Sequence, residues 1–135
     1  MTTITAIVAD DESVARRRLV RMLEESGRVS VVAACAGGRD AVERVVSLRP
    51  DLLFLDVQMP DLDGFDATRE IRRLEAGTGV RVPIVAMTAH AMPGDRERCL
   101  AAGMDDYVTK PISLAEIARV LASIQSSRRA EPPAA

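Results

Sequence analysis

Three carboxylate side chains follow directly on two apolar segments of the chain. Asp10 and Asp11 come after the run 4–9, and Asp56 comes after the run 52–55. Carboxylates brought together repel one another, by about 3 kcal/mol per pair at ~5 Å and an effective dielectric constant of ~20. A hard divalent cation offsets that repulsion, and Mg²⁺ characteristically binds one or two carboxylates together with phosphate oxygens. These acids therefore predict a magnesium site that handles phosphate.

One ammonium group and one hydroxyl group extend this set. Lys110 is the only lysine among the 18 lysine and arginine residues, and Thr88 follows the apolar run 82–87. We expect Lys110 and Thr88 to hold the phosphoryl oxygens that the metal ion does not bind. A carboxylate is already anionic and needs no general base, so Asp56 can attack a phosphoryl donor directly.

A structural role is the competing explanation for each of these residues. Acidic residues after a strand often cap the next helix, and Glu12 fits that role as well as a functional one. Thr88 taken alone would be an ordinary β-branched strand end. Asp56 is harder to explain as a cap, because it opens a loop at 57–64 that is rich in Asp, Pro and Gly.

The elements that would position these residues alternate along the whole chain. The runs 52–55 and 84–87 are continuously apolar, which is typical of parallel strands buried on both faces. Five strands alternating with five helices predict an α/β fold, a doubly wound five-stranded parallel sheet whose ligands bind beyond the carboxyl ends of the strands. Periodicity leaves the strand order open. The predicted strands are 4–9, 29–35, 52–55, 82–87 and 107–109, and the predicted helices are about 13–25, 39–48, 65–76, 94–102 and 114–124.

Length and composition exclude several classes of protein. We expect one domain at 1–125, followed at 126–135 by a disordered tail or a truncated linker, because that segment is small, polar and proline-containing. A net charge of −2 and scarce aromatic residues argue against direct nucleic acid binding. No apolar run reaches the length of a membrane span, and no secretion signal is recognisable. Cys35 and Cys99 fit neither a disulfide framework nor a zinc site, so we expect a cytoplasmic protein.

Several short motifs, in the correct order and spacing, carry a resemblance to a known family. Over about residues 3–124 the chain resembles the receiver domain of two-component response regulators. The resemblance implies a flavodoxin-like sheet with the strand order 2-1-3-4-5. The matching stretches are IVADDE at 7–12, LDVQMP at 55–60, DGF at 63–65, PIVAMTA at 83–89, AGMDDY at 102–107 and KP at 110–111.

The resemblance assigns roles to the acidic residues. Asp56 matches the residue that becomes a 4-aspartylphosphate in this family. Asp10 and Asp11 match the acid pair that binds Mg²⁺ together with Asp56. Gln58 matches the residue whose backbone carbonyl is a further metal ligand.

The resemblance also assigns a conformational switch. Thr88 and Lys110 match the residues that hold the phosphoryl group, and Tyr107 matches an aromatic residue whose rotamer reports phosphorylation. The bond between Lys110 and Pro111 matches one that is usually cis. Thr88 and Tyr107 would change the face formed by the fourth helix, fifth strand and fifth helix.

The function implied is that of a phosphoacceptor in a two-component system or phosphorelay. The phosphoryl donor would be a sensor histidine kinase or a histidine phosphotransferase, and the downstream target or output domain is left open. Such a domain is not an enzyme acting on a separate substrate, although it catalyses its own phosphorylation and dephosphorylation. We expect a monomer or weak dimer, either free-standing or as one piece of a longer or chimeric protein.

Other interpretations remain open from the sequence. A metal-dependent phosphohydrolase of similar fold would typically place a second Asp where Gln58 stands. A pseudo-receiver would serve only for docking, and a flavin carrier would need a Gly-rich phosphate loop where Asp10 and Asp11 stand. His90 is interpreted as a solvated loop residue. The arginines at 16–18 are interpreted as a solvated helix face, with docking of a kinase or phosphotransferase as the alternative.

Overall fold

Five parallel strands form the central layer of the protein, and the computed structural model describes residues 3–89 and 92–130. They pair in the order β2-β1-β3-β4-β5, so the predicted α/β fold and its flavodoxin-like order are confirmed. The strands are β1 (Ile4–Ala9), β2 (Val29–Cys35), β3 (Leu52–Asp56), β4 (Ile84–Thr88) and β5 (Asp106–Thr109). The helices are α1 (Ser13–Glu25), α2 (Gly38–Leu48), α3 (Gly64–Glu75), α4 (Asp95–Ala102) and α5 (Leu114–Ala130).

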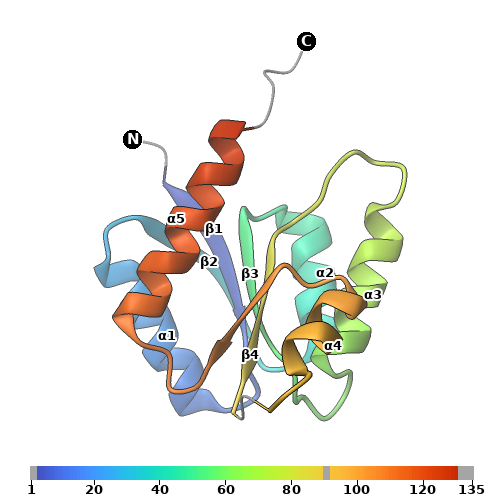
Figure 1. Cartoon of the computed structure of the whole chain (residues 1–135), viewed down its shortest axis with the longest axis horizontal. Helices are drawn as coiled ribbons and strands as arrows, with labels where there is room; N and C mark the ends of the chain where they lie inside the picture. Colours follow the sequence, from blue (N-terminus) through green and yellow to red (C-terminus); the bar gives the residue numbers. More distant parts are fainter. Residues whose placement is uncertain (1–2, 90–91, 131–135) are drawn as a thin grey trace.

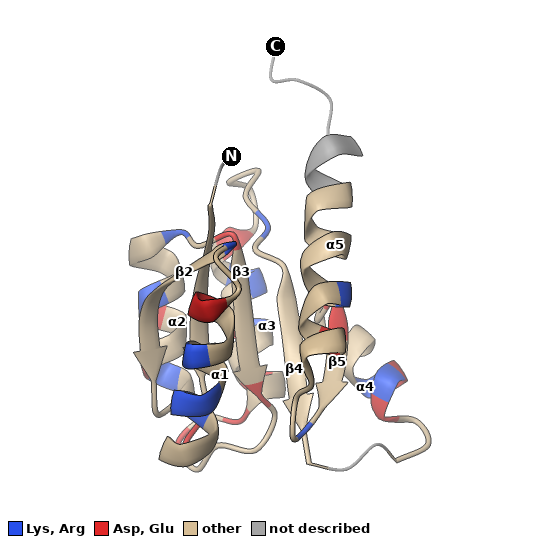
Figure 2. Ribbon diagram, turned by 90° about the vertical axis from the view of Figure 1, so that its left-hand side faces the viewer, with Lys and Arg blue, Asp and Glu red and all other residues tan. Residues whose placement is uncertain are grey.

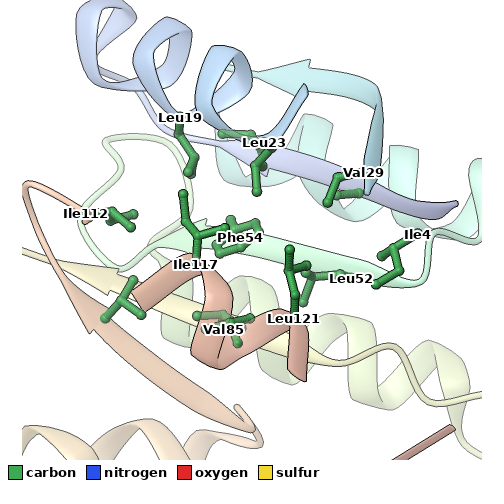
Figure 3. Packing of buried hydrophobic residues seen from close by; sticks show 14 of the residues in the cluster. Ile4, Leu19, Leu23, Val29, Leu52, Phe54, Val85, Ile112, Ile117 and Leu121 are labelled. Carbon is green, nitrogen blue, oxygen red and sulfur yellow. The ribbon is translucent and has the colours of Figure 1, made fainter. Parts of the chain in front are cut away.

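Helices cover both faces of this sheet, with α1 and α5 on one face and α2, α3 and α4 on the other (Figure 1). On the first face, Phe54 of β3 lies between Leu19 of α1 and Ile117 of α5 (Figure 3). On the second face, Leu53 and Leu55 of the same strand join the other core. Successive strand residues point to opposite faces, so burial on both sides makes β3 continuously apolar.

The last helix is longer than its sequence predicts. Ser113 caps α5 as its side-chain oxygen accepts a hydrogen bond from the backbone N–H of Glu116 at 3.1 Å. α5 then continues to Ala130, so residues 126–130 are helical, and their assignment to a tail or a truncated linker stays a prediction. No glycine or proline interrupts that stretch, and nothing therefore stops the helix there. Residues 131–135 lie outside the described part of the chain.

Other residues considered in the sequence have these outcomes. Cys35 and Cys99 are buried free thiols, and burial raises the pKa of Cys35 to about 12, which keeps this thiol protonated. His90 lies outside the described residues. Within the described ranges, no helix combines the length and apolar character needed to cross a bilayer.

An ion network ties α3 to both ends of the segment that includes β4 and α4. The side chain of Arg72 is 15% exposed and donates to the carboxylates of Glu75 at 2.7 Å and Asp105 at 2.9 Å. Its Nε also donates to the carbonyl of Gly103, which caps α4, at 2.9 Å. Asp105 in turn accepts the backbone N–H of Ile84 at 2.8 Å. One guanidinium group thus fixes the start of β4 and the end of α4 against α3.

Replacing this arginine tests how much the network contributes to stability. We expect Arg72→Met to lower the free energy of unfolding by about 2–4 kcal/mol, because it leaves the partly buried Glu75 carboxylate without a cation, Asp105 with only Arg81, and the Gly103 carbonyl without this donor. The neighbouring Arg73→Met removes only an exposed pair with Glu70, and it should change stability little. Urea unfolding followed by circular dichroism measures both. Equal losses in the two variants would contradict the assignment.

Candidate functional site

The carboxyl ends of the strands bring the predicted residues to one edge of the sheet. In Figure 2 this edge is at the bottom, where acidic segments follow the strands. The residues arrive on four elements of the same parallel sheet, so their proximity follows from the topology. They are Asp10 after β1, Asp56 at the end of β3, Thr88 at the end of β4 and Lys110 after β5.

Three carboxylates form a compact cluster. One oxygen each from Asp10, Asp11 and Asp56 lies within 4.8 Å of the others. Asp10 is 1% exposed and Asp56 is 5% exposed, whereas Asp11 is open to solvent. Glu12 is not in this cluster. Its backbone N–H donates to Asp10 Oδ1 at 2.9 Å, which fixes the orientation of that carboxylate.

Lys110 bridges two of the carboxylates. Its Nζ lies 2.7 Å from Asp10 Oδ2 and 3.0 Å from Asp56 Oδ2. Burial alone lowers the pKa of Lys110, but hydrogen bonds to Asp10 and Asp56 outweigh it and raise that pKa above its usual value. The lysine is therefore held as an ammonium ion. The peptide bond from Lys110 to Pro111 is cis, as the family resemblance implied.

The surroundings of Asp56 disfavour the ionisation of its carboxyl group. Burial raises its pKa from 3.8 to about 6, despite a hydrogen bond from the Gln58 backbone N–H at 3.0 Å and the nearby Lys110. The charge of Asp10 raises that pKa further. One ammonium group thus compensates three carboxylates incompletely. Hard oxygen donors with surplus negative charge are what Mg²⁺ prefers, so the cluster fits this ion.

Thr88 and Tyr107 lie on the neighbouring strands β4 and β5. Thr88 is buried and lines a cavity of about 620 Å³ together with Asp11 and Gln58. Tyr107 is half-buried and pairs with Ala86 in the adjacent strand, two residues before Thr88. The structure therefore brings Thr88 to the carboxylates, and it places Tyr107 beside β4 rather than among them.

A glycine that sequence reasoning gave no physical role is needed for the loop after Asp56. The Gly64 N–H donates to the carbonyl of Val57 at 3.0 Å, which folds the start of α3 back onto the end of β3. A Cβ at Gly64 would lie 2.6 Å from the carbonyl oxygen of Asp56. Asp63-Gly64 is part of the recognised motif, but only the geometry explains why no side chain fits there.

The interpretation of residues 16–18 as a solvated face holds for the exposed Arg17 and Arg18 and fails for Arg16, which is half-buried, although the guanidinium groups of Arg16 and Arg18 both reach backbone carbonyls. Arg16 donates to the backbone carbonyl of Asp10 at 2.7 Å, and Arg18 donates to the carbonyl of Ile112 at 2.9 Å. Arg17 has no such contact among the described residues. The contact of Arg18 spans 94 positions along the chain, so no local pattern could indicate it.

The raised pKa of Asp56 predicts a pH-dependent stability. Between 3.8 and about 6 the folded state holds more protons at Asp56 than the unfolded state, so its contribution to stability falls as the pH rises through this window. Without metal, Asp56→Asn should therefore stabilise the protein at pH 7.5, by about 2 kcal/mol. The gain should shrink toward pH 4. Urea unfolding in EDTA at several pH values measures it, and a gain independent of pH would contradict the argument.

The chain resembles parts of several larger signalling proteins. It is 44% identical over 116 residues to the sensor protein GacS of Pseudomonas syringae pv. syringae, covering 85% of this chain and 13% of that protein. It is 42% identical over 106 residues to the histidine-protein kinase BarA of Escherichia coli K12, covering 78% of this chain and 11% of that protein. The chain thus spans a small fraction of the length of these relatives.

Solved structures share the fold over nearly the whole chain. The receiver domain of the sensor histidine kinase PA1611 from Pseudomonas aeruginosa, which has a magnesium ion in its active-site cleft, is 41% identical with a TM-score of 0.80, covering 92% of this chain and 99% of that one. The co-crystal structure of Saccharomyces cerevisiae Ypd1, a histidine phosphotransfer protein, with the receiver domain of Ssk1 matches at 25% identity and a TM-score of 0.84, covering 93% and 91% of the two chains.

A family description agrees with these relatives and with the geometry. The model of the response regulator receiver domain matches residues 6–122, from within β1 to the middle of α5. The resemblance seen in the sequence motifs is therefore confirmed. The chain belongs to the family of response regulator receiver domains.

Proposed function

We propose that Asp56 accepts a phosphoryl group from a phosphohistidine on a sensor histidine kinase or a histidine phosphotransfer protein. The observation that carries this proposal is the position of Asp56, which is buried against the Lys110 ammonium group and within 4.8 Å of Asp10 and Asp11. Relatives that are histidine kinases, and a neighbour solved in complex with a phosphotransfer protein, support this donor class.

The transfer is a displacement at phosphorus. A carboxylate oxygen of Asp56 attacks, the new O–P bond forms, and the N–P bond of the phosphohistidine breaks with its electron pair returning to the imidazole nitrogen. The attacking group is already anionic above its pKa of about 6, so no residue has to remove a proton from it. The task of the protein is therefore positioning and charge compensation.

Charge compensation is shared between the chain and a metal ion. Mg²⁺ held by Asp10, Asp11, Asp56 and the backbone carbonyl of Gln58 would supply positive charge for the phosphoryl oxygens, as proposed by analogy with the magnesium-bound neighbour. Lys110, already 3.0 Å from Asp56 Oδ2, would supply one ammonium group for another oxygen. The Thr88 hydroxyl would donate to a third.

Thr88 and Tyr107 would convert phosphorylation into a change of shape. A phosphoryl oxygen near Thr88 offers an acceptor that the unphosphorylated protein lacks, and a displaced Thr88 would alter the packing of Tyr107 on the adjacent strand. The phosphoryl group thereby shifts the population between two conformations. We place this switch in the cytoplasm, consistent with two free cysteines among the described residues.

The alternative functions have less support. A pseudo-receiver used only for docking would not need the acidic cluster together with Lys110, whereas both are assembled in this protein. A phosphohydrolase would need a second acid two residues after the nucleophile, but the chain has Gln58 there. Repeated release of inorganic phosphate from a phosphomonoester, at more than one turnover per protein molecule, would support the phosphohydrolase instead.

Labelling with a small phosphodonor tests the acceptor. After incubation with acetyl phosphate and Mg²⁺, the intact protein should gain the mass of one HPO₃ group, and peptide mapping should place it on Asp56. The adduct should survive acid and hydrolyse in base. EDTA should prevent labelling.

A matched pair of variants makes this test specific. Asp56→Asn should abolish labelling, while Asp51→Asn, which changes an acid at the other end of β3, should leave it intact. Labelling of Asp56→Asn to the extent of the wild type would show that the acceptor lies elsewhere.

Substitutions at Thr88 test the proposed switch separately from acceptance. Thr88→Ala should still be labelled on Asp56, but the phosphorylation-dependent NMR shifts of Tyr107 should decrease strongly because the hydroxyl is gone. Thr88→Ser retains the hydroxyl and should keep most of these shifts. Wild-type shifts at Tyr107 in the alanine variant would contradict a role for this hydroxyl.

A further inference from the structure

A second cavity lies at the end of the sheet opposite the carboxylates. It has a volume of about 480 Å³ and lies between the last turns of α2 and α3 and the segment 78–83. Val46, Leu74 and Val80 line it, although they are 52%, 40% and 46% exposed to solvent. A volume of this size falls within the range of small-molecule sites, roughly 300–1,000 Å³. Grouped exposed apolar residues around such a cavity indicate a binding surface.

The two acidic residues of the cavity lining accept hydrogen bonds from other parts of the protein. Asp51 accepts hydrogen bonds from the backbone N–H and the hydroxyl of Thr5, at 2.9 and 3.1 Å. Glu75 accepts from Arg72 at 2.7 Å and from the backbone N–H of Val82 at 2.7 Å. Neither carboxylate is therefore left to attract a cation into the cavity.

The two basic residues of the lining differ from each other. Arg81 donates to Asp105 at 3.0 Å. The Arg49 guanidinium is exposed and has no hydrogen bond or ion pair with any residue in the described ranges. Arg49 also has a φ of 47°, a left-handed conformation that glycine adopts more readily at a helix end. The end of α2 therefore does not require an arginine at this position. The Arg49 guanidinium is the one positive charge of the cavity lining that forms no ion pair within the described ranges.

The rim of the cavity is held in place before any ligand arrives. The Thr78 hydroxyl donates to the carbonyl of Glu75 at 2.6 Å and accepts the N–H of Val80 at 3.1 Å. The hydrogen bond from the Val82 backbone N–H to the Glu75 carboxylate fixes the next part of the same rim. A preformed rim lowers the entropy cost of binding.

We infer that this cavity binds a small amphipathic carboxylate. Its apolar body would pack against Val46, Leu74 and Val80, and its carboxylate would form a charge-assisted pair with Arg49. Arginine suits this role because its planar guanidinium can donate two parallel hydrogen bonds to a carboxylate. The site is independent of Asp56, so this inference does not rest on the proposed phosphorylation.

Sodium octanoate is a suitable probe, and octanamide is its uncharged counterpart. Titration of the ¹⁵N-labelled chain should give saturable NMR shifts grouped at Val46, Arg49, Leu74 and Val80. Octanamide should bind more weakly by about three- to tenfold, because it carries no charge to pair with the exposed Arg49 guanidinium. Shifts that rise linearly without saturation, or that spread evenly over the protein, would overturn the inference.

Three variants separate the charge from the apolar lining. Arg49→Gln should weaken octanoate, but not octanamide, by a similar factor. Leu74→Asp, at an exposed position, should weaken both ligands. Arg96→Gln changes an exposed arginine on α4 and should affect neither. Equal octanoate affinity in Arg49→Gln and Arg96→Gln would overturn the inference.

Discussion

Charge balance among three carboxylates and one ammonium group is the constraint on which the rest of the structure depends. Asp10, Asp11 and Asp56 lie within 4.8 Å of one another, and Lys110 contacts two of them. These groups come from the ends of three parallel strands, which two apolar cores hold in fixed register. The carboxylates cannot move apart to relieve their repulsion. That repulsion therefore favours a bound cation, which is the condition for placing a phosphoryl group there.

Much of the fold could be predicted because burial determines where apolar residues occur in the sequence. β3 and β4 are buried on both faces, so their residues form continuous apolar runs, and alternation with helices indicates a parallel sheet. The edge that carries the site follows from this topology. Strand order could not be predicted in this way, because hydrophobic periodicity carries no information about which strands pair. The order came from the resemblance to a family, and the structure confirmed it.

Contacts between distant segments could not be predicted in the same way. Arg16 and Arg18 lie on a helix face whose composition indicates solvent, but their guanidinium groups reach carbonyls elsewhere in the fold. The network around Arg72 likewise joins segments that are separate in sequence. The role of Gly64 depends on how closely two backbones approach. Residue types indicate which groups are available, whereas only the folded chain decides which pairs form.

The presence of a single lysine has a practical consequence. Lys110 carries the only side-chain amine of the chain, and that side chain is 20% exposed. Succinimidyl esters, amine coupling to a sensor surface and enzymatic acetylation would therefore share two targets, this amine and the chain terminus. Modification at Lys110 would remove the cation that joins Asp10 to Asp56. Immobilisation and fluorescent tagging of this protein should be directed to the terminal amine or to an engineered cysteine.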